Sequence, residues 1–344
     1  MNDKIENLLE ENRKFTPKTD LSQNANATSE WFDEANENRL EFWKKQALER
    51  ITWFKEPTEI LDSSNPPFFK WFKDGELNLS YNCLDRHLET DADRVAFYWE
   101  GEPGDTQQIT YQDLYERVCR LSNALKKLNV KKGDRVAIYL GMTPEIVVAM
   151  LACARIGAVH SVVFGGFSSE ALADRINDAK AKLVITADGA WRRGDIVPLK
   201  DNVDGSLELT EYIENVIVVK RTNQDIDMKQ GRDHWYHEIT EKEQSVCEPE
   251  IMNAEDMLYI LYTSGTTAKP KGIVHTQAGY LTGVTTTHHE VFDIKDDDIY
   301  WCAADCGWVT GHSYIVYGPL ANKATSVMYE GAPNAPDEKR LWSI

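Results

Sequence analysis

The stretch MLYILYTSGTTAKPKG, residues 257–272, carries the strongest structural signal in the chain. Its first six residues are apolar or aromatic and predict a buried strand, and the polar segment after them predicts a loop at the end of that strand. Within ten residues this loop contains four hydroxyl side chains, two glycines, Lys269 and Lys271. Closely spaced backbone N–H groups, short hydroxyl donors and lysine charges together bind anions, so the loop predicts a polyphosphate site.

The spacing of the loop excludes two common nucleotide-binding motifs. A Walker A loop has four residues between its first glycine and its Gly-Lys pair. In this chain six residues separate Gly265 from Gly272, and Ile273 follows directly. The dinucleotide pattern GxGxxG is absent from the sequence. The loop therefore needs a different explanation from either motif.

Outward from this stretch, helix and strand patterns alternate from about residue 90. Thr110 with Asp113, and Thr143 before Pro144, are typical helix starts, and Gly157 is a typical helix stop. The predicted strands are continuous apolar runs, as expected for parallel strands that are covered on both faces. They are RVAIYL (135–140), AVHSVVF (158–164), KLVIT (182–186) and NVIVVK (215–220). This pattern predicts a doubly wound α/β fold with a parallel sheet flanked by helices.

The N-terminal part of the chain has a different pattern. Residues 1–28 are polar and predict a loosely ordered lead-in. After Ser29, apolar residues recur at steps of three and four, which predicts one face of a long helix ending before Pro57. These residues are Leu40, Trp43, Ala47, Ile51 and Phe54. We therefore predict a helical cap region at 29–89 and an α/β domain at 90–344, in which the polar segment 222–255 is a connector.

Composition limits the classes of partner. The chain has 344 residues with 56 acidic and 38 basic side chains, a formal net charge of −18. This balance argues against nucleic acid as a partner, because nucleic acids require clustered Lys and Arg. No apolar run approaches the roughly 20 residues of a membrane span, and the N-terminus has no secretory pattern. We predict a cytoplasmic protein without a membrane partner, and the sequence leaves its oligomeric state open.

Metal-like and acid–base-like groups in the sequence have simpler interpretations. The six cysteines lie mostly in apolar runs and are predicted to be small buried side chains. Cys302, Cys306 and His312 lack the fourth ligand of a zinc site. The pair His288-His289 is predicted to lie on a solvated helix face. No metal ligand is therefore assigned.

The segment YTSGTTAKPKG (262–272) resembles the signature loop of the adenylate-forming acyl-CoA synthetases. Three further runs resemble the AMP-forming acetyl-CoA synthetase family in particular, and the resemblance covers roughly residues 29–344. They are WFKDGELNLSYNCLDRH (71–87), HSVVFGGFS (160–168) and DIYWCAADCGWVTGHSYIVYGPL (298–320). Members of this family adenylate a carboxylate with ATP and Mg²⁺, release pyrophosphate, and then transfer the acyl group to the thiol of CoA.

The resemblance implies an acetate:CoA ligase that uses ATP, CoA and Mg²⁺. A propionyl-CoA or 3-hydroxypropionyl-CoA synthetase is an alternative, as is a non-catalytic nucleotide- or CoA-binding remnant. Family members continue well past the position that matches Ile344. The resemblance therefore implies an incomplete adenylation domain, with the adenylation lysine and the small C-terminal domain beyond Ile344. Catalysis by this chain alone is not expected.

The resemblance also assigns site residues. It implies phosphate contacts, a short acyl pocket whose tryptophan fills the space of a longer acyl tail, and contacts to CoA. Two positions depart from the family pattern: Ala268 replaces a common glycine, and Asp195 replaces an arginine of some relatives. The implied phosphate-binding residues are Thr263, Ser264, Gly265, Thr266, Thr267 and Lys271; the acyl-pocket residues are Trp308, Val309 and Thr310; the CoA-binding residues are Gly165, Gly166, Arg192 and Arg193.

Overall fold

The computed structural model describes residues 14–263 and 270–344. Within these ranges the larger sheet has seven strands in the order β12-β11-β8-β6-β7-β14-β15. Neighbouring strands are parallel except β14 and β15, which form an antiparallel pair at one edge. The strands are β6 (Arg135–Tyr139), β7 (Val159–Val162), β8 (Leu183–Ala187), β11 (Asn215–Val219), β12 (Asp233–Trp235), β14 (Met257–Thr263) and β15 (Lys271–Thr276).

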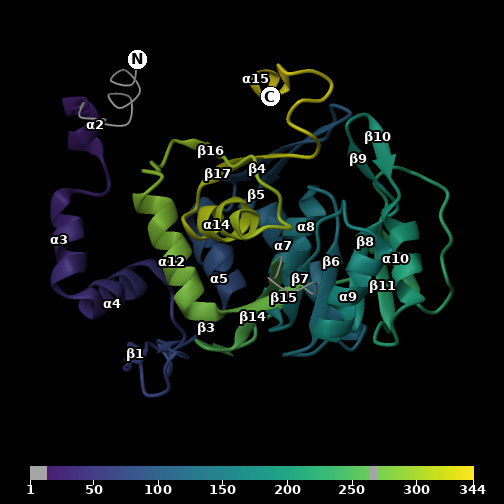
Figure 1. Cartoon of the computed structure of the whole chain (residues 1–344), viewed down its shortest axis with the longest axis horizontal. Helices are drawn as coiled ribbons and strands as arrows, with labels where there is room; N and C mark the ends of the chain where they lie inside the picture. Colours follow the sequence, from purple (N-terminus) through teal and green to yellow (C-terminus); the bar gives the residue numbers. More distant parts are fainter. Residues whose placement is uncertain (1–13, 264–269) are drawn as a thin grey trace, which may run out of the picture.

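Helices cover this sheet as the alternating pattern predicts (Figure 1). Every residue of β7 and β8 is buried, so both faces of the central strands are covered. The predicted capping box is present, because the Thr110 side chain accepts from the Asp113 N–H and the Asp113 side chain accepts in return. The helices are α7 (Tyr111–Lys127), α8 (Pro144–Arg155), α9 (Ser169–Ala179), α10 (Leu199–Leu207) and α11 (Tyr236–Thr240). The predicted doubly wound α/β architecture is confirmed.

A smaller sheet packs beside the first. In the described ranges it has four strands in the order β16-β17-β4-β5, with β4 parallel to β17 and antiparallel to β5. Its strands are β4 (Val95–Glu100), β5 (Thr106–Thr110), β16 (Ile299–Trp301) and β17 (Thr325–Tyr329). The helical segments between β15 and β17 are α12 (Gln277–Glu290), α13 (Val309–Gly311), the π-helical η2 (His312–Tyr317) and α14 (Gly318–Ala321).

Short elements complete the chain. Figure 1 shows α3 and α4, in purple, at the outer side of α12, and α4 packs against α12. The remaining elements are α2 (Thr19–Asn24), α3 (Ser29–Glu37), α4 (Arg39–Arg50), β1 (Leu61–Asp62), β2 (Lys70–Trp71), β3 (Glu76–Leu77), α5 (Leu79–Cys83), η1 (Asp85–His87), α6 (Leu88–Asp91), β9 (Ala190–Arg192), β10 (Asp195–Val197), β13 (Met252–Asn253) and α15 (Arg340–Ser343). None of the helices in the described ranges is both long and apolar enough to cross a membrane.

The single long helix predicted after Ser29 is wrong. The structure has two helices that break at Asn38, and the second one ends at Arg50. Asn38 caps the second helix by accepting from the Glu41 N–H at 3.2 Å. At the other end, the Asn82 side chain accepts the Thr52 N–H at 2.8 Å and donates to the Thr52 carbonyl at 3.0 Å. The Asn82 amide thus satisfies the N–H and the carbonyl of Thr52, which in a continued helix would bond to other backbone groups. The helix can therefore end at Arg50, and the chain continues in an extended conformation.

Two polar segments carry more structure than their composition suggests. Residues 19–24 form α2, and Asn26 after it donates to the carbonyls of His289 and Ile294 at 2.9 and 3.0 Å. The connector 222–255 contributes β12, which pairs in parallel with β11. In both segments the regular structure is supported by contacts with distant parts of the chain. The spacing of apolar residues in the sequence gives no information about such contacts.

Candidate functional site

A pocket lies at the carboxyl ends of the parallel strands. Beyond β6, β7 and β8 the chain continues into Gly141-Met142, Phe164-Gly165-Gly166 and Ala190 to Arg192, and each of these segments lines the pocket. Open α/β sheets bind ligands at this edge, because their loops converge there from several strands. The sheet topology thus places three separate segments around one cavity.

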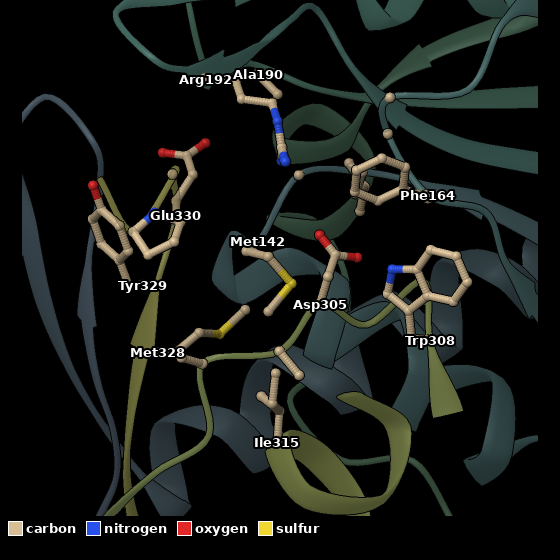
Figure 2. Close-up of a pocket in the computed structure, with 18 of the residues that line it drawn as sticks. Met142, Phe164, Ala190, Arg192, Asp305, Trp308, Ile315, Met328, Tyr329 and Glu330 are labelled. Atoms are coloured by element: carbon tan, nitrogen blue, oxygen red, sulfur yellow. The ribbon is translucent and has the colours of Figure 1, made fainter. Parts of the chain in front are cut away.

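The smaller sheet provides the opposite wall. Residues after β16 and at the end of β17 line the pocket together with two residues near α13, and the cavity measures ≈ 450 Å³. Figure 2 shows side chains from both walls pointing into the same space. The wall from this part of the chain includes Trp301, Cys302, Ala303, Ala304, Asp305, Trp308, Thr310, Ile315, Met328, Tyr329, Glu330 and Gly331.

The pocket brings together residues that the sequence assigned to two different functions. Gly165, Gly166 and Arg192, predicted for CoA, and Trp308 and Thr310, predicted for the acyl group, all line it. Their roles stay predictions, but their convergence from segments about 140 residues apart is a property of the fold.

Two predicted residues lie elsewhere. Val309 is 45% exposed and is not part of the pocket wall. Arg193 lines a separate hollow together with Glu102 and Gly194. Arg193 takes a left-handed conformation at the tip of the β9–β10 hairpin, with φ 56°, and it does not line the pocket that Arg192 lines. The structure therefore separates the two adjacent arginines.

The two glycines after β7 differ in how much space a side chain would have at each position. A Cβ on Gly166 would lie 2.6 Å from the Phe164 ring, whereas a Cβ on Gly165 would find ordinary contacts of 3.4 Å or more. Gly166 thus leaves room for the aromatic ring that forms one side of the pocket. Arg192 lies over this same ring, with its guanidinium carbon 5.2 Å from the ring centroid. Phe164 therefore holds the cationic group over the pocket.

Two acidic residues of the pocket, Asp305 and Glu330, were not predicted from the sequence. Glu330 is buried and accepts from Arg221 Nε at 2.9 Å, and Arg221 also makes a bidentate pair with Asp105 at 2.9 and 3.0 Å. Burial raises the pKa of Glu330, and Arg221 opposes the rise. Because two carboxylates offset the charge of Arg221, this cation is already satisfied within the protein. An acidic residue inside an apolar run, as in AADCGW, was the available signal for Asp305.

Asp305 lies in a tight turn after β16. Its Oδ1 accepts the Gly307 N–H at 2.7 Å, and its backbone carbonyl accepts the Trp308 N–H at 3.0 Å. Burial raises the pKa of Asp305, while the Gly307 N–H and the charge of Arg192 oppose the rise. The turn thus holds a carboxylate beside the predicted acyl-pocket tryptophan.

The predicted phosphate segment begins at the same edge of the sheet. Thr263 ends β14, Lys271 begins β15, and the two are cross-strand partners with exposed side chains. Because β14 is parallel to β7, the Thr263 end of β14 and the pocket segment after β7 share one edge. The other predicted phosphate contacts, Ser264, Gly265, Thr266 and Thr267, lie outside the described residues.

Three of the eight histidines and five of the six cysteines are buried. His288 is fully buried in α12, and burial lowers its pKa to about 4, so the predicted solvated pair is wrong for this residue. It packs edge-on to Tyr300 with ring centroids 4.7 Å apart. All six cysteines fall in the described residues; five are buried and Cys302 is partly exposed, which confirms their prediction as packing residues.

The fold and the pocket define an α/β protein with a ligand site at the carboxyl edge of its parallel sheet. Residues 84–344 match the family described as AMP-binding enzyme, and residues 19–83 match the family described as acetyl-coenzyme A synthetase N-terminus. The chain belongs to the AMP-binding enzyme family. The two matches meet between residues 83 and 84. The boundary predicted from the sequence lies six residues later, between 89 and 90.

Curated relatives support the same assignment. The chain is 59% identical to an acetyl-coenzyme A synthetase of Streptomyces avermitilis over 345 residues, which cover 100% of this chain and 53% of the relative. It is 55% identical to one of Pasteurella multocida over 343 residues, covering 98% of this chain and 52% of that protein. The chain thus spans about half the length of the curated relatives that it matches.

Proposed function

We propose that this chain supplies the phosphate-binding loop, the acyl pocket and part of the CoA site of an AMP-forming acetate:CoA ligase. The observation that carries the proposal is the convergence of Arg192, Gly166 and Trp308 on one pocket at the carboxyl edge of the sheet. The similarity to acetyl-coenzyme A synthetases along the whole chain supports acetate as the acid.

The proposed reaction has two steps. An oxygen of acetate attacks the α-phosphorus of ATP, pyrophosphate leaves, and acetyl-adenylate forms. The sulfur of CoA then attacks the acetyl carbonyl carbon, and AMP leaves. Thr263 and Lys271 would hold the phosphates, since such transfers depend on positioning and charge stabilisation. Trp308 would limit the acyl length, and Arg192, which has no ion-pair partner among the described residues, would hold an anionic group of the substrates.

Mg²⁺ belongs to this proposal as an ion that accompanies ATP. Among the described residues, no three His, Cys, Asp or Glu side chains gather closely enough to hold a metal ion. Protein-bound Mg²⁺ often keeps its waters and takes most of its other ligands from substrate phosphates. We therefore propose that Mg²⁺ arrives on ATP, and we assign no step to a metal held by this chain. The cytoplasmic location remains a prediction from the sequence.

The test uses a hybrid in which residue 344 is followed by the C-terminal part of the Streptomyces avermitilis relative. With acetate, ATP, Mg²⁺ and CoA, we expect the hybrid to release pyrophosphate and to form acetyl-CoA. Lys271→Ala should weaken ATP handling at least tenfold in kcat/KM, whereas Lys44→Ala on the exposed face of α4 should not. A hybrid that folds but releases no pyrophosphate would refute the proposed function. Higher kcat/KM for propionate than for acetate would favour the propionate enzyme.

The chain of 344 residues should bind ATP or CoA without making a thioester. Titration calorimetry of this chain with each ligand checks the expectation directly. Binding without turnover, combined with an inactive hybrid, would instead support the non-catalytic remnant.

A further inference from the structure

Asp305 places a carboxylate oxygen in the pocket with no protein partner. Its Oδ1 accepts the Gly307 N–H, while Oδ2 has no hydrogen bond or ion pair among the described residues. Figure 2 shows the carboxylate pointing into the open space, with Arg192 across the cavity and Trp308 beside it. Arg192 and Asp305 both line the pocket without forming an ion pair. The carboxylate is therefore available to a ligand.

The turn that carries Asp305 is fixed by backbone packing. A Cβ on Gly307 would lie 2.9 Å from the Phe164 Cα, and a Cβ on Gly311 would lie 2.2 Å from the Asp305 carbonyl oxygen. Backbone atoms cannot give way as a flexible side chain can, so both glycines mark places where two backbone segments touch. The carboxylate is thus held at a set position relative to the segment after β7. Such rigidity is what a catalytic group needs.

The negative charge of Asp305 suits the second step of the proposed reaction better than the first. Acetate is an anion, and a carboxylate beside the acyl site would repel it rather than bind it. The acetyl group of the adenylate is neutral, and the thiol that attacks it must lose a proton. Thr310 and Trp308 place the acyl wall next to Asp305 on one side, and Arg192 and Gly166 place the predicted CoA wall on the other.

Resting on the proposed function, we propose that Asp305 is the general base that takes the proton of the CoA thiol during thioester formation. The S–H bond breaks as Oδ2 takes the proton. The sulfur electron pair forms the C–S bond with the acetyl carbonyl carbon. The bond between that carbon and the adenylate phosphate oxygen breaks, and AMP leaves with the electron pair. Asp305 then returns its proton to solvent, so atoms and charges balance.

The surroundings of Asp305 suit this role. The charged and titratable groups that line the pocket with Asp305 are Arg192 from β9, Tyr329 at the end of β17, Glu330 directly after β17, and Cys302 on the same segment as Asp305. Cys306, next to Asp305, is fully buried. Glu330 is paired with Arg221 and is not a competing free base. Burial raises the pKa of Asp305, which makes its carboxylate a stronger base than an exposed one.

The test measures the two steps separately in the hybrid. Asp305→Asn keeps an oxygen to accept the Gly307 N–H but cannot take a proton. We expect acetate-dependent exchange of labelled pyrophosphate into ATP to be retained or to rise, because the neutral side chain no longer repels acetate. Single-turnover formation of acetyl-CoA from preformed acetyl-adenylate should fall by about 10²-fold or more. Asp297→Asn, an exposed aspartate on the preceding turn, is the matched control and should change neither rate.

A second measurement requires no variant. In the unchanged hybrid, the rate of acetyl-CoA formation should fall at acid pH as Asp305 is protonated, and pyrophosphate exchange should not share that limb. Equal losses in both steps for Asp305→Asn, or an unchanged thioester step, would overturn the role of Asp305. A missing acid limb would do the same. Absence of pyrophosphate exchange in the unchanged hybrid would instead refute the proposed function on which this inference rests.

Discussion

A buried ion pair joins the short helix η1 to α8, and its removal gives the clearest test of the fold. Arg155, the last residue of α8, has a side chain that is 1% exposed, and it binds both oxygens of Asp85 at 2.8 Å. Its Nε also donates to the Cys247 carbonyl at 2.5 Å. One guanidinium thus links η1, α8 and the segment before β13. Its donors therefore satisfy acceptors from two other parts of the chain.

Arg155→Met keeps the long apolar stem but removes the charge and the donors. It leaves the Asp85 carboxylate, 15% exposed, without its partner, so we expect a loss of about 3–5 kcal/mol in the free energy of unfolding. Asp85→Asn should cost a similar amount by leaving the guanidinium unpaired. The double variant should lose less than the sum, with a coupling free energy of about 2–3 kcal/mol.

A surface pair provides the control, because burial rather than distance should decide the size of the effect. Lys45 and Glu34 lie 3.0 Å apart, but their side chains are 49% and 51% exposed. Water screens such a pair, so Lys45→Ala should leave the urea midpoint of unfolding close to that of the unchanged chain. Urea unfolding followed by tryptophan fluorescence gives all these values. A coupling below about 0.5 kcal/mol between residues 155 and 85 would refute the reasoning.

Further predictions concern titration, helix packing and specificity. Because burial holds the pKa of His288 at about 4, below its unfolded value, the stability it contributes is present above pH 6.5 and is lost as pH falls toward 4. His288→Gln should therefore reduce the slope of stability against pH by about 1.4 kcal/mol per unit between pH 6 and 5, measured by urea unfolding; an unchanged slope would contradict this. Gly283→Ala, where a Cβ in α12 meets nothing, should stabilise by about 0.5–1 kcal/mol, whereas Gly311→Ala should destabilise. Thermal unfolding that moves both glycine variants in the same direction would be inconsistent with the packing. In the hybrid, Trp308→Ala should raise kcat/KM for propionate relative to acetate by roughly tenfold or more; an unchanged ratio would remove Trp308 from the acyl wall.

Local patterns in the sequence were sufficient for the central sheet. The apolar runs at β6, β7, β8 and β11 and the caps at Thr110 and Pro144 depend on near neighbours, so they could be identified without tertiary information. The end of α4 at Arg50 could not, because the Asn82 side chain that replaces the helical hydrogen bonds is 30 residues away. The same holds for β17, which inserts between β16 and β4 although β4 lies more than 200 residues earlier in the chain.

In the candidate site, too, some features could be predicted from the sequence and others could not. The loop beginning at Thr263 was identified from its residue types and spacing, and the GWVTG segment (307–311) from its resemblance to the family. Arg192 and Arg193 are adjacent in the sequence but line different hollows, and Arg193 lies at a hairpin tip in a left-handed conformation. Their order in the sequence does not reveal this separation. For Asp305 the sequence offered only its position inside an apolar run, and its burial and unpartnered oxygen became known from the tertiary structure.

By itself, then, the sequence determined the parallel α/β architecture and the chemical family, because these follow from apolar runs, capping residues and contiguous motifs. It also predicted a phosphate-binding loop, and that role stays a prediction. The tertiary structure alone decided which residues meet. It joined the predicted acyl and CoA residues in one pocket, excluded Val309 and Arg193 from it, and added Asp305 and Glu330. The physical reason is that burial, pairing and electrostatic environment depend on segments brought together only when the two sheets pack.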